Sequence, residues 1–227
     1  MEGNVVEHRV EAVERALSIL DCFREGAAEL TLATLARETG LYKSTILRLL
    51  ASLERFGYVT RTAPGSYRLG ASVWRLGAVY RSAYDLGEHI RPELRRLVEV
   101  TGESASFYVR EGNARVCLYR QNSPKPVRHH IEEGTRLPLE GGASALVILA
   151  WSGEGHEDVL ACGHARSLGV RDRDAAAIAV PVFDRSGAFH GALSVSGLIT
   201  RLDGAAVEKA LQALHEGADR LRQVLPG

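Results

Sequence analysis

Apolar side chains recur at helical spacing over the first 56 residues, and polar and apolar residues then alternate over shorter stretches. Gly57 ends the last of these helical stretches, and a Pro64-Gly65 turn separates the two alternating ones. The predicted elements are helices at 10–24, 32–39 and 43–56 and strands at 58–62 and 66–69. This order predicts a helix-turn-helix unit followed by a two-stranded wing.

Three residues stand where a helix-turn-helix has its strictest steric needs. Ala36 is small enough for the point where two helices cross, and Gly40 adopts the positive φ of the turn without strain. Ile46 is the apolar residue that anchors the second helix, and Thr31 is a plausible N-cap for the first. The side chains expected to fill the interior are Leu32, Leu35, Ile46, Leu49, Leu50 and Leu53.

The remainder of the chain mixes strand and helix patterns. Helices are predicted at 71–87, from Pro92 to about residue 100, at 143–151, and along a C-terminal stripe from Val207 to Leu221; strands are predicted at 105–110, 115–120, 126–131, 178–183 and 189–196. Strands grouped with helices at both ends favour an α+β domain, an antiparallel sheet covered by helices. We therefore divide the chain into a winged helix-turn-helix domain (1–70), a linker helix (71–88) and an effector-binding and oligomerisation domain (89–227).

The linker helix carries its own apolar stripe. Its members are Val73, Leu76, Val79, Tyr80 and Ala83. A stripe between two domains has to be buried, and a symmetric partner is the simplest place for it. Packing back onto its own domain is the alternative, and both arrangements are compatible with a DNA-binding protein.

Composition narrows the class of protein. The 227 residues are 45% hydrophobic and carry a formal net charge of zero, which argues against a chain that coats nucleic acid nonspecifically. No apolar run approaches a membrane helix, the first residues lack the features of a signal peptide, and three scattered cysteines form no disulfide framework. These features predict a cytoplasmic protein with no membrane partner.

The charge is unevenly distributed. Between residues 40 and 70 there are five basic residues and one acidic residue, whereas the preceding stretch is acidic. Within this segment Lys43, Ser44, Thr45 and Arg48 share one helix face, opposite the apolar residues. Hydroxyls and backbone N–H groups at a helix N-terminus suit phosphates, and an arginine one turn further on can reach base edges.

Arg61 and Arg68 on the predicted wing suit phosphates or the minor groove. The sequence therefore predicts that double-stranded operator DNA is a partner. A winged helix recruited for protein–protein contact is the alternative.

Nothing in the sequence indicates an enzyme, a cofactor or a metal. The run Gly142-Ala143-Ser144-Ala145 lacks the closing glycine of a nucleophile elbow, and there is no Gly-Lys-Ser/Thr phosphate loop. His156, Cys162 and His164 have side chains that suit zinc, but their loop-rich segment favours solvated surface residues.

Over nearly its full length the chain resembles the IclR family of bacterial transcriptional regulators. The N-terminal motifs that carry the resemblance are Val-Glu-Arg-Ala-Leu-Ser-Ile-Leu at 13–20, Lys-Ser-Thr at 43–45, Arg-Leu-Leu at 48–50 and Tyr-Arg-Leu-Gly at 67–70. The C-terminal ones are Val-Pro-Val at 180–182, Leu-Ser-Val-Ser-Gly at 193–197 and Arg-Leu at 201–202. The resemblance implies a GAF/PAS-like effector domain and a homodimer or tetramer, often a repressor, that responds to a small organic acid or aromatic metabolite.

The resemblance also implies which residues line an effector pocket. They are His129, Ala143, Ser144, Asp172, Ser194 and Ser196. The two serines, two residues apart, would lie on one face of a strand. Ala177 stands where the family often has a cysteine, and the segment from Trp151 to Ala176 is shorter than usual, which predicts the loss of a helix beside the pocket. Two interpretations remain: a more open pocket for a different ligand, or a domain that serves only oligomerisation.

Overall fold

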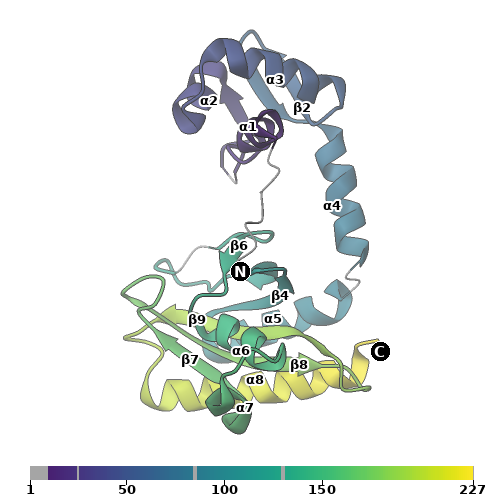
Figure 1. Ribbon diagram of the computed structural model, residues 1–227. Coiled ribbons are helices and arrows are strands. Elements are labelled where there is room, and N and C mark those ends of the chain that lie inside the picture. Colours follow the sequence, from purple (N-terminus) through teal and green to yellow (C-terminus); the bar gives the residue numbers. More distant parts are fainter. Residues whose placement is uncertain (1–9, 25, 84–85, 129–130, 227) are drawn as a thin grey trace, which may run out of the picture. The chain divides into compact units, whose positions relative to one another are not determined.

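The computed structural model describes residues 10–24, 26–83, 86–128 and 131–226. The chain forms two compact units, Met1–Tyr84 and Asp85–Gly227. Figure 1 labels their helices and strands. Each unit is described by itself.

The first unit is a winged helix-turn-helix. Its helices are α1 (Glu11–Leu20), α2 (Leu32–Thr39), α3 (Lys43–Arg55) and α4 (Ala71–Ala83), and its strands are β1 (Glu29–Thr31), β2 (Val59–Ala63) and β3 (Ser66–Leu69). The strands form an antiparallel sheet in the order β1-β3-β2. The helix pattern and the wing follow the sequence prediction closely. The sequence analysis missed β1, because three residues are too few to show an alternation.

The core of this unit lies between α1, α2, α3 and the sheet. Ile19, Leu35, Ile46, Leu50 and Tyr67 are buried almost completely. Leucines at 32, 49 and 53 pack against them and are partly buried, so the predicted interior is present. The outer face of α1 differs, because its apolar residues at 10, 13 and 17 are exposed.

Two local features fix the turn between α2 and α3. Thr31 caps α2, its Oγ1 accepting a hydrogen bond from the backbone N–H of Thr34 at 3.1 Å. Gly40 ends α2 with φ of +70°, and its N–H donates to the carbonyl of Ala36 at 3.0 Å. A left-handed residue at this position turns the chain so that α3 starts three residues later.

The second unit is a six-stranded antiparallel sheet with helices on both faces, in the strand order β6-β5-β4-β9-β8-β7. Its elements are α5 (Gly87–Thr101), β4 (Ser104–Glu111), β5 (Ala114–Gln121), β6 (Arg136–Pro138), α6 (Ala143–Trp151), α7 (Glu157–Cys162), β7 (Ala165–Leu168), β8 (Ala175–Phe183), β9 (Phe189–Leu198) and α8 (Gly204–Val224). Helices α5 and α8 cover one face and α6 covers the other (Figure 1). This is the α+β architecture predicted from the sequence.

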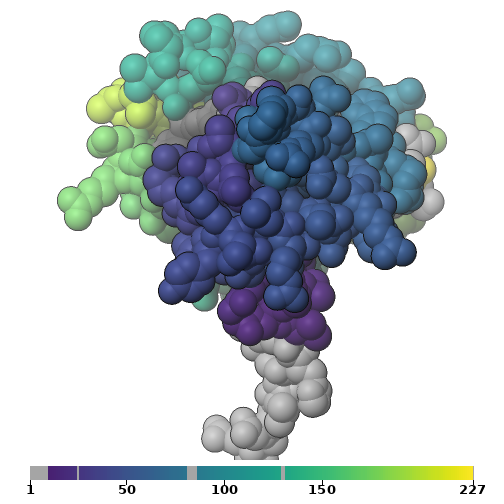
Figure 2. All heavy atoms as spheres, turned by 90° about the horizontal axis from the view of Figure 1, so that it is seen from above, coloured from purple at the N-terminus to yellow at the C-terminus, as the bar shows by residue number. Residues whose placement is uncertain are grey.

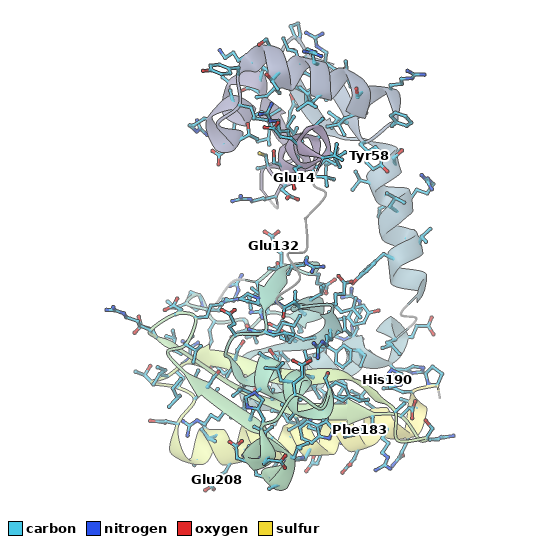
Figure 3. All side chains as sticks on the ribbon, in the orientation of Figure 1. Glu14, Tyr58, Glu132, Phe183, His190 and Glu208 are labelled. Atoms are coloured by element: carbon cyan, nitrogen blue, oxygen red, sulfur yellow. The ribbon has the colours of Figure 1, made fainter. Side chains whose placement is uncertain are left out.

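The buried helix α6 packs tightly on the sheet. Ala145, Val147 and Ile148 are fully buried against Cys117 and Ala179 of the strands below. Phe183, labelled in Figure 3, belongs to β8 and makes an edge-on contact with the ring of Trp151 at the end of α6, with ring centroids 6.1 Å apart. Small residues on the sheet let α6 approach closely, and its N-terminus is thereby fixed above β9.

Three details of this unit differ from the sequence prediction. Helix α5 begins at Gly87 and carries Pro92 inside it, because Ile90, Leu94 and Leu97 form one buried stripe that extends the helix toward its N-terminus. The strand expected at 126–131 is absent from the described part of that segment. The third strand is instead β6, which pairs with β5. Prolines at 124 and 126 interrupt a hydrogen-bonded ladder, which explains the shift.

The segment between α6 and β8 is also more structured than predicted. It holds a short helix, α7, and an edge strand, β7, which pairs with β8. Val159 of α7 is buried in the cluster under α6. The segment therefore contains a helix, and the predicted loss of a helix beside the pocket stays a prediction.

Candidate nucleic-acid interface and ligand pocket

The outer face of α3 is polar, basic and exposed. Lys43, Ser44 and Arg48 are exposed and Thr45 is half-buried, while Ile46 and Leu50 on the opposite face are in the core. The first turn of α3 contains no acidic residue, and no side chain caps its N–H groups. Figure 2 shows the surface of this unit, with the residues of α2, α3 and the wing in blue. The structure therefore brings the four predicted residues of α3 together on one solvent-facing surface.

The wing presents one cation on each of its faces. Arg61 of β2 is paired with Tyr67 of β3, and Arg68 of β3 is paired with Thr60 of β2. Paired residues share a face and neighbours alternate, so the two arginines project to opposite sides. Both are exposed. Arg68 also lies opposite Glu29 of β1 in the ladder, which moderates the positive field on that side.

The cations of α3 and the wing are not engaged by acidic side chains in the described part of the unit. Among the residues that the structure describes, Lys43, Arg48, Arg61 and Arg68 form no ion pair. The guanidinium carbon of Arg61 instead lies 6.0 Å from the ring centroid of Tyr67. Their charge is available to an external anion.

Tyr42 is a residue of this surface that the sequence analysis missed. It is the N-cap of α3 and 85% exposed, although tyrosine usually buries much of its ring. Its place directly before Lys43 puts a phenol beside the N-terminus of α3. The signal available in the sequence was an aromatic residue between the turn glycine and the basic helix.

A cavity of about 70 Å³ lies in the second unit, between the N-terminus of α6 and the sheet. Four of the predicted effector residues line it: Ala143 and Ser144 from α6, and Ser194 and Ser196 from β9. Asp172 does not line it, because its carboxylate accepts a hydrogen bond from the N–H of Asp174 in the turn before β8. His129 lies outside the described residues.

Hydrogen bonds already fix part of the cavity wall. The N–H of Ala143 donates to Oγ of Ser167 at 3.0 Å, and Oγ of Ser194 donates to the carbonyl of Ile178 at 2.9 Å. Since its proton is engaged, the buried Ser194 hydroxyl is oriented to accept from a ligand. Ser196 is half-buried one step along the same face.

Arg115 and Tyr108 also line the cavity, and the sequence analysis missed both. Arg115 of β5 is 6% exposed, and its Nη1 donates to the carbonyls of Pro138 and Gly141 at 2.6 and 3.0 Å. Burial lowers the pKa of Arg115 and raises the pKa of Tyr108 to about 12. The guanidinium carbon of Arg115 lies 5.9 Å from the ring centroid of Tyr108. The available signal was that Arg115 lies two residues before the apolar Cys117 in β5, and therefore on the same face of the strand.

Other candidate sites are weaker. Within the described ranges, no group of three or more His, Cys, Asp or Glu side chains is placed to hold a metal ion. Cys162 and His164 instead bond locally, with Sγ of Cys162 donating to the carbonyl of His164 at 3.0 Å. None of the described helices has the length and apolar character to cross a lipid bilayer.

Comparisons with known proteins agree for both units. A family model of the IclR helix-turn-helix domain matches residues 12–63, and one of the bacterial transcriptional regulator IclR C-terminal domain matches residues 78–168 and 162–223. The chain is 26% identical to the HTH-type transcriptional regulator XynR of Escherichia coli, over 95% of this chain and 97% of that protein. It is 29% identical to the E. coli DNA-binding transcriptional repressor YiaJ, over 95% and 88%.

The fold is also found among solved structures. An IclR homologue from Microbacterium hydrocarbonoxydans complexed with 4-hydroxybenzoate superposes with a TM-score of 0.75, at 22% identity, over 93% of this chain and 97% of that one. At this identity the likeness concerns the fold alone.

Proposed function

Because the chain belongs to the IclR family of bacterial transcriptional regulators, we propose that it is a repressor whose affinity for operator DNA is controlled by a small organic acid. DNA binding and transcriptional regulation belong to the family. The repressor role and the acid are our proposals. The observation that carries them is a cavity in the second unit lined by Arg115, Ser194 and Ser196, on a chain whose first unit presents exposed cations.

On the DNA side, α3 is the recognition helix. Lys43, Ser44 and Thr45 at its N-terminus bind phosphates, because unpaired N–H groups and the helix dipole both favour an anion there. Arg48, one turn further on, reads base edges in the major groove. Arg61 and Arg68 of the wing contact the adjacent backbone. The exclusion of acidic residues from this surface supports a DNA partner over a protein partner.

On the ligand side, Ala143, Ser144, Ser194 and Ser196 form the effector site. The cavity they line supports ligand binding over the alternative, a domain reduced to oligomerisation. A relative of the same fold was crystallised with 4-hydroxybenzoate, an aromatic acid, and a relative of 29% identity is a repressor. Both observations concern those proteins, and they motivate the same assignment for this chain.

A second copy of the chain completes the regulator. Helix α4 carries exposed apolar side chains at Trp74, Leu76 and Val79, which a symmetric partner would cover. A homodimer, or a tetramer built from two, would place two α3 helices on half-sites one helical turn or a multiple of it apart. An acid can change that spacing only to the extent that it binds the two arrangements with different affinity.

Genomic footprinting of the full-length chain in its host, followed by fluorescence anisotropy on the recovered operator, tests the proposal. We expect one palindromic operator and a loss of DNA affinity when an organic acid is added, with 4-hydroxybenzoate as the first probe. An acid at 100 times its dissociation constant should also stabilise the protein by about 2.7 kcal/mol in thermal unfolding. Bound fragments with no common sequence would refute the operator, and an operator complex indifferent to every acid tested would refute the control.

A further inference from the structure

Arg115 is a buried cation that has no anionic partner among the residues that the structure describes. Its side chain is withdrawn from solvent, and its Nε has no hydrogen-bond partner among the described residues. Nη1 is engaged by two carbonyl oxygens, which carry no formal charge. Within the part of the chain that the structure describes, no carboxylate lies within ion-pair distance of this guanidinium.

The described residues around the cavity add positive charge near Arg115. Burial is the largest cause of the lowered pKa of Arg115, and the positive charge of Arg171, which is exposed at the rim of the same cavity, lowers that pKa as well. None of the described residues that line the cavity is acidic. An uncompensated buried charge is costly, and a hydrogen-bonded anion is the group that offsets it.

The guanidinium also lies beside the N-terminus of α6. A side-chain carbon at Gly142, the N-cap of this helix, would come within 3.0 Å of Nη2 of Arg115. Gly142 also has φ of +89°, which glycine adopts without strain. Both the positive φ and the nearby guanidinium therefore favour glycine at this position. An anion placed against Nε and Nη2 would therefore also meet the positive end of α6.

We propose that Arg115 is the counter-ion of the effector, and that the cavity selects small carboxylates by pairing their acid group with this guanidinium beside the N-terminus of α6. The inference rests on the proposed effector role of the cavity. A cavity of about 70 Å³ has room for a compact acid. Ser194 and Ser196, which the family resemblance singled out, then contact the uncharged end of the ligand.

Matched pairs of acid and neutral amide test the inference on the full-length chain. The probes are acetate with acetamide, succinate with succinamide, and 4-hydroxybenzoate with 4-hydroxybenzamide, measured by calorimetry. At least one acid should bind at least tenfold more tightly than its amide. Arg115→Gln should remove this difference. Arg185→Gln should keep it, because Arg185 is an exposed arginine of the β8–β9 turn in the same unit.

A second readout does not depend on knowing the acid. In crystals soaked in sodium bromide, an anomalous peak should lie in contact with Nε or Nη2 of Arg115. Arg115→Gln should remove the peak. Arg115→Lys, which keeps the charge, should retain it and preserve the fold if the glutamine variant unfolds.

Two results would overturn the inference: bromide that avoids Arg115 in the wild type, or an Arg115→Gln variant that still discriminates acid from amide. These outcomes are separable from the fate of the proposed function. An acid that releases DNA equally well from the Arg115→Gln variant supports the proposed function and refutes the counter-ion role of Arg115. An acid that binds through Arg115 without changing DNA affinity supports the counter-ion role and refutes the proposed control of DNA binding.

Discussion

Removing single cations from α3 and the wing should flatten the salt dependence of DNA binding by a predictable amount. Each phosphate contact contributes about −0.9 to the slope of log K against log salt concentration. Lys43, Arg48, Arg61 and Arg68 are exposed and form no ion pair among the described residues, so each is available for one contact. If Lys43, Arg61 and Arg68 contact phosphates while Arg48 contacts a base, one unit contributes a slope of about −2.7, and two units on one operator about −5.4.

The variants should divide by the role of the cation. Lys43→Gln and Arg61→Gln should each make the slope shallower by about 0.9 per bound unit, with a similar loss of affinity on any DNA sequence. Arg48→Gln should instead cost about 1–3 kcal/mol on the operator and little on unrelated DNA, because a base contact discriminates. Arg68→Gln should change the slope less than Arg61→Gln, since Glu29 lies across the ladder from Arg68.

Fluorescence anisotropy of a labelled operator between 50 and 200 mM KCl measures these slopes. The control is Arg24→Gln, which removes an exposed arginine of the same unit that belongs to neither α3 nor the wing. Its slope should equal that of the wild type. If Lys43→Gln and Arg61→Gln also leave the slope unchanged, these side chains do not contact phosphates, and the DNA-binding surface has been assigned to the wrong face.

Three further predictions concern stability and reactivity. Gly40→Ala should destabilise the first unit by about 1 kcal/mol in chemical unfolding and Gly40→Asn by less, because no atom lies within 4 Å of the added carbon and the cost is the positive φ alone. Burial by itself would raise the pKa of Glu103, but hydrogen bonds from Arg201 and from the lysine at 125 outweigh it, and the net shift is downward. The stabilisation from Glu103 should therefore be complete above about pH 4.3, the pKa in the unfolded chain, and be lost as the pH falls through the lower pKa of the folded protein. Glu103→Gln should lower the free energy of unfolding by an amount on the order of 3 kcal/mol at pH 7, and it should weaken the decrease of the unfolding temperature at acid pH. Iodoacetamide at pH 8 should label the exposed Cys162 and spare Cys117, because burial raises the pKa of Cys117 to about 11; equal labelling, read by peptide mass spectrometry, would contradict its burial.

The first unit was predictable from the sequence because its determinants are local. The N-cap at Thr31, the left-handed Gly40 and the small Ala36 all act within one or two helical turns, and α2 has the bounds that the pattern predicted. Helix α5 was not predictable in the same way. Pro92 is a strong local signal for a helix start, but burial of Ile90 in the sheet interface outweighs it.

The cavity of the second unit was predictable only in part, for a similar reason. The two-residue spacing of Ser194 and Ser196 places them on one face of β9 whatever the partner strand does. The order of the strands in the sheet decides which strands supply the opposite wall. In the sheet, β4 lies beside β9 and β5 lies beside β4, although both precede β9 by some 70 residues in the sequence. The sequence analysis accordingly found the serines and missed Tyr108 and Arg115.

An irregularity in the sheet completes this explanation. Ser106 of β4 pairs with Arg120 of β5, but two residues later Tyr108 pairs with Cys117, so β5 contains one extra residue between these pairs. Ser106 and Tyr108 share a face, and the bulge therefore puts Arg120 and Cys117 on that same face, although strict alternation separates residues three apart. Arg115, two residues from Cys117, follows it onto the side of the cavity. A single inserted residue thus brings both arginines of β5 to the face covered by α6, where Nη1 of Arg120 donates to Oγ of Ser106 at 2.8 Å and Nε of Arg115 has no hydrogen-bond partner among the described residues.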